Sequence, residues 1–226
     1  MDTLLRRRAM IASGGGEPPT PPTPTILPVF YDNLNFDGVA YIETDLLLPQ
    51  DGSVLISCYF GTTESRKPQR IFDVGGLIGA VLDSRTDSQA RYESFFYGDT
   101  TATQLSTKLY WNSGASLELF LTPNYGGFGS FKTNITKGAN IPNSPLVIGQ
   151  NTISPEQALA GTLRKCRIYD SSAQNVSNTS GFSSYTPVYT LVPCTYDGEP
   201  GLWCEEENKF YGNSNSTGTL TVSNNE

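Results

Sequence analysis

Histidine is absent from this chain of 226 residues. Without an imidazole, the chain lacks the commonest general base and the commonest transition-metal ligand, which excludes histidine-based hydrolase triads and zinc sites. Charged residues are also scarce at 16%, and the net charge of −7 argues against nucleic-acid binding, because that binding requires a basic face. No apolar stretch approaches the roughly 18 residues of a transmembrane helix, so we expect no membrane partner.

The cysteines form no C-x-x-C pair, which argues against a zinc or redox motif. Cys58 and Cys166 lie inside apolar, strand-like runs, and we expect both to be buried thiols that pack as small hydrophobic groups. Cys194 and Cys204 flank the Asp-Gly turn signal at 197–198. The sequence leaves open whether these two form a disulfide across a hairpin or stay reduced.

Turn-forming and aromatic residues are abundant: the chain has 22 glycines and 15 prolines, and aromatics make up 11% of it. Short alternating runs of apolar and polar residues are separated by Gly, Asp-Gly and Asn turns, which predicts an antiparallel β-sandwich. Polar loops are expected at 83–88 and 171–184, and a helical turn at 154–160. The expected strands are 30–36, 39–48, 53–60, 70–74, 77–82, 91–97, 108–111, 116–121, 128–135 and 146–149.

The first 28 residues differ in composition from the rest of the chain. Residues 1–12 carry arginines between apolar side chains, and residues 13–28 hold a Gly-rich hinge followed by a proline-rich stretch that favours a stiff stalk. Apolar anchors combined with guanidinium groups suit a shallow groove with acidic rims, so we expect residues 1–12 to dock on a partner. A solvated terminus without a partner is the alternative. The expected anchoring residues are Leu4, Leu5, Arg6, Arg7, Arg8 and Met10.

Four segments carry a resemblance to a known family: residues 35–44 near the start, and residues 161–170, 191–204 and 208–213 near the end. They resemble the concanavalin A-like, laminin-G-like jelly-roll domains encoded by bacteriophages of gut Bacteroides, including crAss-like phages. The resemblance extends over residues 30–222. It implies an all-β fold, an antiparallel β-sandwich of the concanavalin A-like jelly-roll type at 29–226, preceded by an extended N-terminal anchor peptide.

The same resemblance implies a bacteriophage virion surface protein: a head fibre, a capsid decoration protein or a tail-associated adhesin. The N-terminus would bind a capsid or tail structural protein, the sandwich would bind host surface polysaccharide, and the protein would be a homo-oligomer. We expect synthesis in the bacterial host cytoplasm, because the apolar run after Arg8 is too short for a signal peptide. The alternatives left open are a stand-alone carbohydrate-binding lectin and a glycan-active enzyme.

Catalysis is not expected. Glycoside hydrolases place two carboxylates about 5–10 Å apart across one sugar. The Glu-x-Asp-x-x-Glu signature of the jelly-roll hydrolases does not occur here. Glu118 alternates with leucines and would point to the opposite face from them, but no partner acid is evident. Residues 205–207 are consecutive glutamates that predict an exposed turn.

Two ligand sites are candidates. Asn124, Tyr125 and Phe128 surround a Gly-Gly pair, which would let a sugar approach and stack on the aromatic faces. The competing interpretation is a β-turn whose aromatics pack in the core. The resemblance also implies a candidate Ca²⁺ site at a rim of the sandwich, although no D-x-D-x-D-G ladder occurs and no other cofactor is expected. Its candidate oxygen donors, in predicted loops, are Asp83, Asp87, Asp99 and Asn124.

Overall fold

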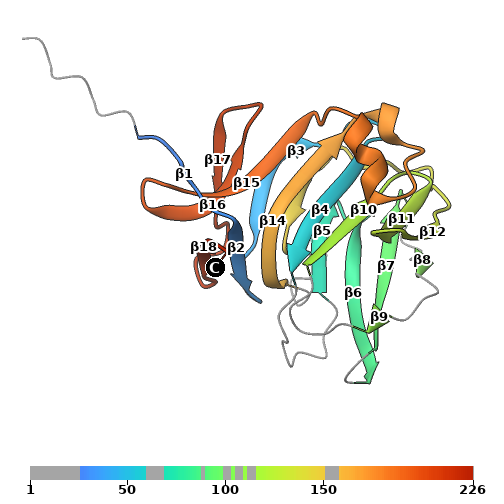
Figure 1. Ribbon diagram of the computed structural model, residues 1–226, viewed down its shortest axis with the longest axis horizontal. Coiled ribbons are helices and arrows are strands. Elements are labelled where there is room, and N and C mark those ends of the chain that lie inside the picture. Colours follow the sequence, from blue (N-terminus) through green and yellow to red (C-terminus); the bar gives the residue numbers. More distant parts are fainter. Residues whose placement is uncertain are drawn as a thin grey trace, which may run out of the picture.

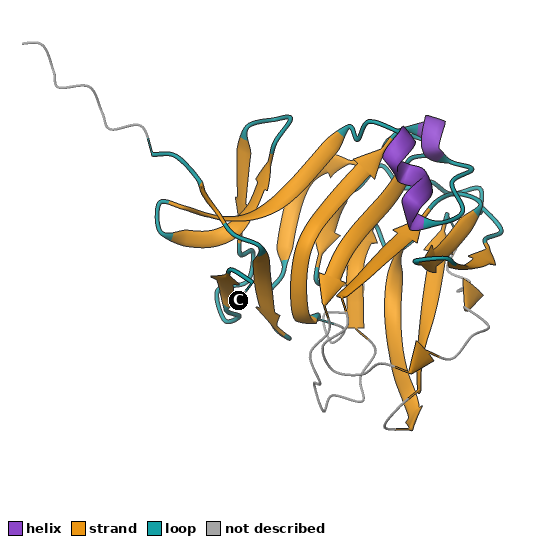
Figure 2. Ribbon diagram, in the orientation of Figure 1, coloured by secondary structure: helices purple, strands orange, loops and turns teal. Residues whose placement is uncertain are grey.

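A computed structural model describes residues 26–59, 69–87, 90–98, 103–104, 109–110, 116–150 and 158–225. Within these residues the chain forms two antiparallel sheets that pack face to face around one main hydrophobic core (Figure 1). In this described part of the chain, helix is confined to short 3₁₀ turns at one end of the sandwich (Figure 2). The predicted all-β antiparallel sandwich is therefore confirmed. The proposed anchor residues, from Leu4 to Met10, and most of the proposed stalk lie outside the described residues.

The larger sheet is built from eleven described strands and carries the surface that matters below. Its central path is β12 (Phe131–Asn134), β11 (Tyr125–Phe128), β10 (Ser116–Leu121), β4 (Ser53–Tyr59), β14 (Ala160–Tyr169), β15 (Tyr189–Tyr196), β16 (Glu199–Cys204) and β17 (Lys209–Gly212). Three further strands attach to this path: β1 (Val29–Phe30) pairs with β15, while β2 (Asn33–Asp37) pairs with β14 and with β18 (Leu220–Ser223).

The smaller sheet has seven described strands and covers the opposite side of the core. Its order is β3 (Ile42–Leu47), β13 (Pro145–Ile148), β5 (Gln69–Val74), β6 (Ile78–Asp87), β7 (Ala90–Tyr97) and β8 (Thr103–Gln104), and β9 (Leu109–Tyr110) also pairs with β7. The connection from β14 to β15 contains the 3₁₀ helices η2 (Ser171–Ala173) and η3 (Thr179–Ser184).

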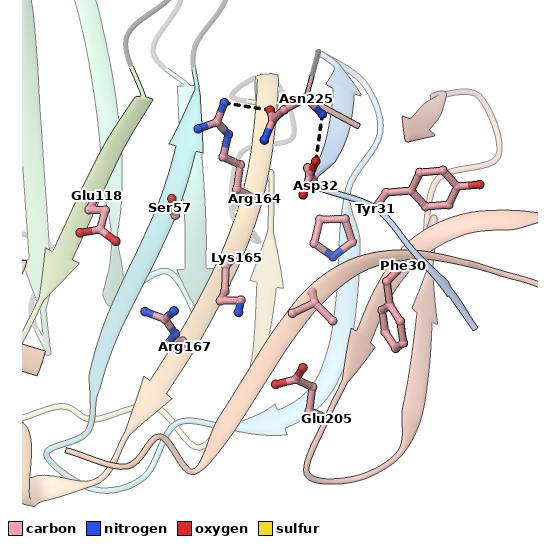
Figure 3. A pocket seen from close by; sticks show the side chains of 12 residues that line it. Phe30, Tyr31, Asp32, Ser57, Glu118, Arg164, Lys165, Arg167, Glu205 and Asn225 are labelled. Carbon is pink, nitrogen blue, oxygen red and sulfur yellow. Dashed lines mark hydrogen bonds between the residues drawn. The ribbon is translucent and has the colours of Figure 1, made fainter. Parts of the chain in front are cut away.

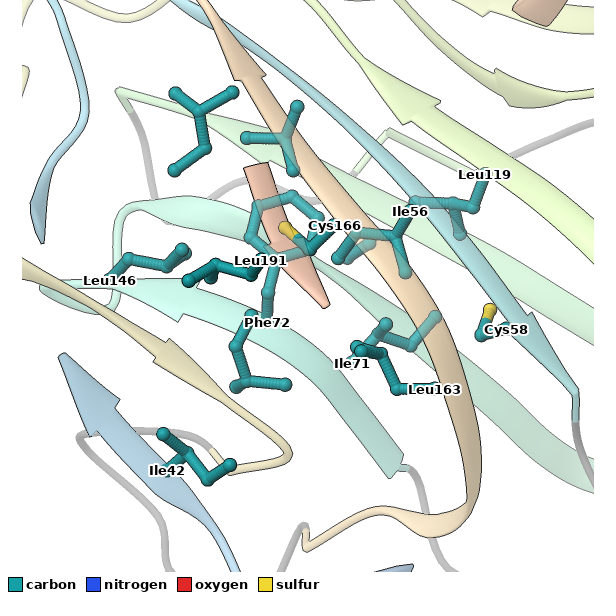
Figure 4. Close-up of a cluster of buried hydrophobic side chains, with 14 of the residues drawn as sticks. Ile42, Ile56, Cys58, Ile71, Phe72, Leu119, Leu146, Leu163, Cys166 and Leu191 are labelled. Carbon is teal, nitrogen blue, oxygen red and sulfur yellow. The ribbon is translucent and has the colours of Figure 1, made fainter. Parts of the chain in front are cut away.

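Alternation along the strands explains which side chains form the core. In β3, buried and exposed residues alternate strictly along its length, as a half-buried strand requires. Phe72 and Leu146 of the smaller sheet face Ile56, Leu119 and Cys166 of the larger one in the cluster of Figure 4. All of these side chains are almost completely removed from solvent, so each contributes apolar burial to stability.

The Asp-Gly turn was predicted correctly from sequence. Tyr196 pairs with Glu199, so β15 and β16 are joined by a two-residue loop. Asp197 and Gly198 have φ values of 51° and 81°. Positive φ at both central positions is the geometry that matches the twist of a hairpin, and Asp-Gly is among the sequences that adopt it most readily.

One expected strand, 128–135, is wrong in its limits. The structure forms a hairpin there, with β11 ending at Phe128 and β12 beginning at Phe131. Gly129 has a φ of 53° and supplies the turn. The glycine pair at 126–127 lies inside β11 rather than in a turn. A larger residue does not fit at Gly126, because an added Cβ there would lie 2.5 Å from the ring of Phe95. Close approach to another chain segment, not a turn, accounts for these glycines.

The polar loop expected at 83–88 is also incorrect over most of its length. Strand β6 continues to Asp87, and its partner β7 begins at Ala90. Asp83 stands opposite Tyr92, and Asp87 opposite Ala90, with a register shift between them. Pairing within the hairpin therefore overrides the low strand propensity of a polar sequence.

The expected loop at 171–184 is ordered into two capped 3₁₀ turns. The side chains of Asp170 and Asn178 accept hydrogen bonds from backbone N–H groups at the two starts. Phe182 is buried, with its ring centroid 4.8 Å from that of Tyr169, and it fastens the connection to the outer face of the larger sheet. The sequence-based prediction missed this role of Phe182, because the segment was judged by its average composition, which is polar. Residues 154–157, the start of the expected helical turn, lie outside the described residues.

All four cysteines are buried, and none of them forms a disulfide. Cys204 stands opposite Leu191 and lies in the core between the sheets, whereas Cys194 stands opposite Gly201 and belongs to an aromatic cluster on the other face. The two side chains point to opposite faces of the hairpin, so the disulfide that the sequence left open does not form. Cys58 and Cys166 are core thiols, as predicted.

We expect the thiols to be unreactive until the protein unfolds. Burial raises the pKa of Cys166 to about 12 and that of Cys194 to about 11. At a pH of about 8 the folded protein would hold almost no thiolate at these positions, and thiolate is the reactive species. A chromogenic thiol reagent should therefore label the protein only in denaturant. Rapid labelling of the native protein, or a lower melting temperature in reductant, would contradict this expectation.

Candidate functional site

A groove runs across the outer face of the larger sheet, on the side away from the core. It consists of two hollows of about 430 and 380 Å³ that share Glu118 and Arg167. Figure 3 shows the first hollow, in which charged side chains from β10 and β14 stand beside aromatic residues of the N-terminal segment. Both hollows are open to solvent, so the groove could hold an extended ligand.

The alternation of side chains along the strands determines which residues form the floor of the groove. On β4, Ile56 and Cys58 point into the core, so Ser57 between them points outward. On β10, Leu119 is a core residue, and Glu118 opposite Ser57 lines the groove. The sequence-based orientation of Glu118, on the face opposite to that of Leu119, is therefore correct.

A β-bulge in β14 changes the charge of this floor. Leu163 stands opposite Cys58 and Lys165 opposite Ser57, so Arg164 is an extra residue in the strand. Because of this extra residue, Arg164 and Lys165 both line the groove, while Leu163 and Cys166 on either side of them are buried in the core. In a regular strand, one residue of this consecutive pair would point into the core.

Arg167 follows on the same outward face of β14, after buried Cys166. The three basic side chains form a column along the strand in Figure 3, and each is half-buried. We call Arg164, Lys165 and Arg167 the basic column. The sequence signal for it was a basic doublet inside an otherwise alternating strand, and the sequence-based site prediction did not include it.

Apolar and aromatic residues form one wall of the groove. The ring of Phe30 is 53% exposed, and half-buried Tyr31 follows it. The backbone N–H of Tyr31 donates to the carbonyl of Pro193 at 3.0 Å, which fixes this segment against β15. Buried Val192 completes the wall.

The C-terminal end of the described chain forms another wall. The backbone N–H of Asn225 donates to Asp32 at 2.9 Å, and the Asn225 side chain accepts from the Arg164 guanidinium at 3.3 Å (Figure 3). Arg164 also donates through Nε to Asn33 at 3.2 Å. These bonds hold the guanidinium in place at the groove edge.

The second hollow has a different lining. Apolar and aromatic side chains of the sheet and of the connection after η3 lie beside a hydroxyl-rich rim formed by η3 itself. Burial raises the pKa of Tyr169 there, and neighbouring Arg167 partly opposes the rise. The rim offers the hydroxyl groups of Thr179, Ser180 and Ser183, which can both donate and accept hydrogen bonds.

The sugar-binding residues predicted from sequence do not form one exposed platform. Phe128 is buried in the core and stacks on Phe131 with ring centroids 5.3 Å apart, so it offers no free face. The Tyr125 ring is half-buried under the ammonium of Lys132, 4.6 Å from its centroid. The Asn124 amide donates to the backbone of Gln174 and to Asn175. Glycan contact at Asn124 and Tyr125 stays a prediction.

The sequence predicted that the candidate calcium donors lie in loops, but not all of them do. Asp83 and Asp87 lie in strand β6, Asn124 is held by the bonds described above, and Asp99 lies outside the described residues. Among the described residues, no group of three or more Cys, Asp or Glu side chains could hold a metal ion. A Ca²⁺ site therefore stays a prediction.

The glutamate run at 205–207 is exposed, as expected. Glu206 accepts a hydrogen bond from the backbone of Thr190, and Glu207 accepts one from the Tyr211 hydroxyl. Two of the three carboxylates thus tie the turn to its neighbours, while Glu205 lines the groove. Among the helices in the described part of the chain, none has the length and apolar content needed to cross a bilayer.

Comparison with known proteins identifies the fold. No protein-family model and no curated protein matches the sequence. The structure is similar to a native heptameric SAP-like pentraxin from Limulus polyphemus, with a TM-score of 0.53 and 11% identity over 84% of this chain and 94% of the pentraxin. It is also similar to a "putative carbohydrate binding protein" from Bacteroides ovatus ATCC 8483, with a TM-score of 0.55 and 11% identity over 87% of this chain. This chain spans 61% of the latter protein. The chain is therefore a jelly-roll β-sandwich that shares its fold with these two proteins.

Proposed function

We propose that the chain is a carbohydrate-binding, lectin-like protein whose ligand lies in the groove on the outer face of the larger sheet. The observation that carries the proposal is the combination of an aromatic wall with a polar, charged floor in one open groove. The printed description of the Bacteroides ovatus protein supports the same class of function. Because similarity of fold does not establish function, the proposal rests mainly on the chemistry of the groove.

Each part of the groove suits one part of a sugar. Phe30 presents an exposed ring, and an aromatic ring can pack against the apolar C–H face of a pyranose. Glu118 and Glu205 offer carboxylate oxygens that accept hydrogen bonds from hydroxyl groups, and charge-assisted bonds are the stronger ones. Ser57 can both donate and accept. Two adjoining hollows supply length for a short oligosaccharide.

We also propose that the protein does not hydrolyse the glycan. The residue directly opposite Glu118 on β4 is Ser57, and on the other side β11 ends at Phe128, opposite Leu119, so that a glycine, Gly129, bonds to the Glu118 carbonyl. The basic column lies next across the sheet, so positive groups stand between Glu118 and the other acids of this hollow, Glu205 and Asp32. A hydrolase would need two carboxylates across one bond.

Replacing Phe30 with alanine should weaken glycan binding by about tenfold, because one buried stacking contact contributes about 1 kcal/mol or more. Phe131→Ala is the matched control, since Phe131 is similarly exposed at 49% but lies on β12, away from the groove. A glycan array followed by calorimetric titration of the retained glycan measures both variants. Equal losses in the two variants, or no retained glycan at all, would overturn the proposed function.

A finer proposal places this domain on a bacteriophage particle. It rests on the sequence resemblance and on the order of a basic, apolar peptide, a hinge and a proline-rich stretch before the sandwich. The protein would be a head fibre, capsid decoration protein or tail-associated adhesin, made in the bacterial cytoplasm and displayed as a homo-oligomer. Particle incorporation of a chain lacking residues 1–25 separates this role from a stand-alone lectin, because only a virion protein would need the segment.

A further inference from the structure

We propose that the groove selects sugars that carry an anionic substituent, a carboxylate or a sulfate, and that Lys165 and Arg167 bind this group. The inference rests on the proposed function and names the class of its ligand. Glycan binding in general and preference for acidic glycans can be tested separately, because different residues of the groove would be responsible for the two properties.

The fold gathers three basic side chains in one place. The bulge at Arg164 puts two consecutive basic side chains on the ligand side of β14, and Arg167 extends the column on the same face. The chain as a whole carries a net charge of −7. Three carboxylates line the same hollow, but the three cations are gathered side by side on one strand, so this point of an acidic protein would attract an anion.

Two of these cations have no ion-pair partner among the described residues. In the part of the chain that the structure describes, neither Lys165 nor Arg167 has a carboxylate within salt-bridge distance. Arg164 instead bonds to the amide oxygens of Asn33 and Asn225, which orients it at the groove edge. Both Lys165 and Arg167 are half-buried, so an anion bound between them would be partly shielded from water and salt.

Acidic side chains in the same hollow limit the kind of anion that can bind. Exposed carboxylates of Asp32, Glu118 and Glu205 stand around the basic column. They would repel a ligand with charge on every unit at close spacing, such as a nucleic acid, but would accept hydrogen bonds from sugar hydroxyls. The surface thus fits a sugar with one acidic group among several hydroxyls. A guanidinium binds both carboxylate and sulfate oxygens well.

The test compares pairs of glycans that differ only in charge. Methyl galacturonoside and its methyl ester form the carboxylate pair, and lactose 3′-sulfate and lactose form the sulfate pair, so that each acidic member carries one charge and its counterpart carries none. We expect the wild-type protein to bind at least one acidic member about tenfold more tightly than its neutral counterpart, with a preference that falls as salt rises. The double variant Lys165→Gln/Arg167→Gln should lose the preference and keep the weaker binding of the neutral form.

Lys132→Gln is the matched control, because Lys132 is a cation on β12 outside the groove and its loss should leave the preference intact. Melting temperatures of all variants verify that the fold is retained. Equal binding of charged and neutral members by the wild type, or an unchanged preference in the double variant, overturns the selection of acidic sugars while the proposed function stands. If neutral and acidic glycans all fail to bind, the proposed function is wrong as well.

Discussion

Replacing Asp73 with alanine is expected to lower the free energy of unfolding by about 3–5 kcal/mol, because it leaves a buried charge without its partner. Asp73 is fully buried and Arg70 is 3% exposed. Arg70 donates to Asp73 Oδ1 through both Nε and Nη2, and the backbone N–H of Gly76 donates to Asp73 Oδ2 at 2.9 Å. The guanidinium carbon also lies 4.7 Å from the centroid of the Phe96 ring.

Truncation of Asp73 therefore has two costs in the folded state. The guanidinium stays buried without a counter-charge, and the Gly76 N–H loses its acceptor. Urea titration followed by fluorescence measures the loss. Lys137→Ala is the matched control, because the Lys137–Asp51 ion pair is partly exposed and such pairs contribute at most about 1 kcal/mol.

The pair can also be removed together. A double variant, Arg70→Met/Asp73→Leu, should be more stable than Asp73→Ala alone, since no unpaired charge remains inside the protein. Equal stability of Asp73→Ala and Lys137→Ala would show that water reaches the pair and that its burial does not determine its contribution.

Replacing Phe95 with alanine is the second change with a large expected effect, a loss of about 3–5 kcal/mol. Phe95 lies on β7 of the smaller sheet, and its ring is fully buried in the core. An added Cβ at Gly126 of β11 would lie 2.5 Å from its Cγ, so the ring packs directly on the backbone of the larger sheet. Removal of the ring would leave a cavity at this contact between the sheets.

The opposite change tests the same contact from the other side. Gly126→Ala alone should cost about 1–3 kcal/mol through overpacking against the ring. In the Phe95→Ala background the new methyl group would occupy part of the vacated space, so the two losses should not add, with a coupling above about 1 kcal/mol. Chemical denaturation of the four proteins in this cycle gives the coupling, and simple additivity would contradict the packing described here.

Turns and strands were predicted correctly where a local property of the residues also determines the structure. The Asp-Gly pair adopts the positive φ values that its turn requires, and strand β10 coincides with the predicted alternating run 116–121. The β-turn weighed as one interpretation of residues 124–128 does not form at Gly126, where glycine is needed because of the ring of Phe95, 31 positions away in the sequence. Contacts of that kind leave no local pattern to follow.

The candidate site was harder to predict than the fold. The orientation of Glu118 followed from alternation and is correct. The aromatic wall at Phe30 and the basic column of β14 were missed, because both depend on which strands become neighbours. Phe30 reaches the groove only because β1 pairs with β15, and Lys165 faces it only because of the bulge. Neither the β1–β15 pairing nor the bulge in β14 can be derived from the residues of one strand.

The bulge in β14 has a consequence for how this surface can vary through evolution. Leu163 pairs with Cys58 before the bulge, and Cys166 pairs with Ile56 after it. Loss of one codon between them would restore a regular strand and keep both of these core pairs. The strand can therefore gain or lose a residue at this position without a change in the core packing of the sandwich. A single in-frame insertion or deletion could add or remove one ligand-facing residue, which offers descendants of this chain a simple route to new binding preferences.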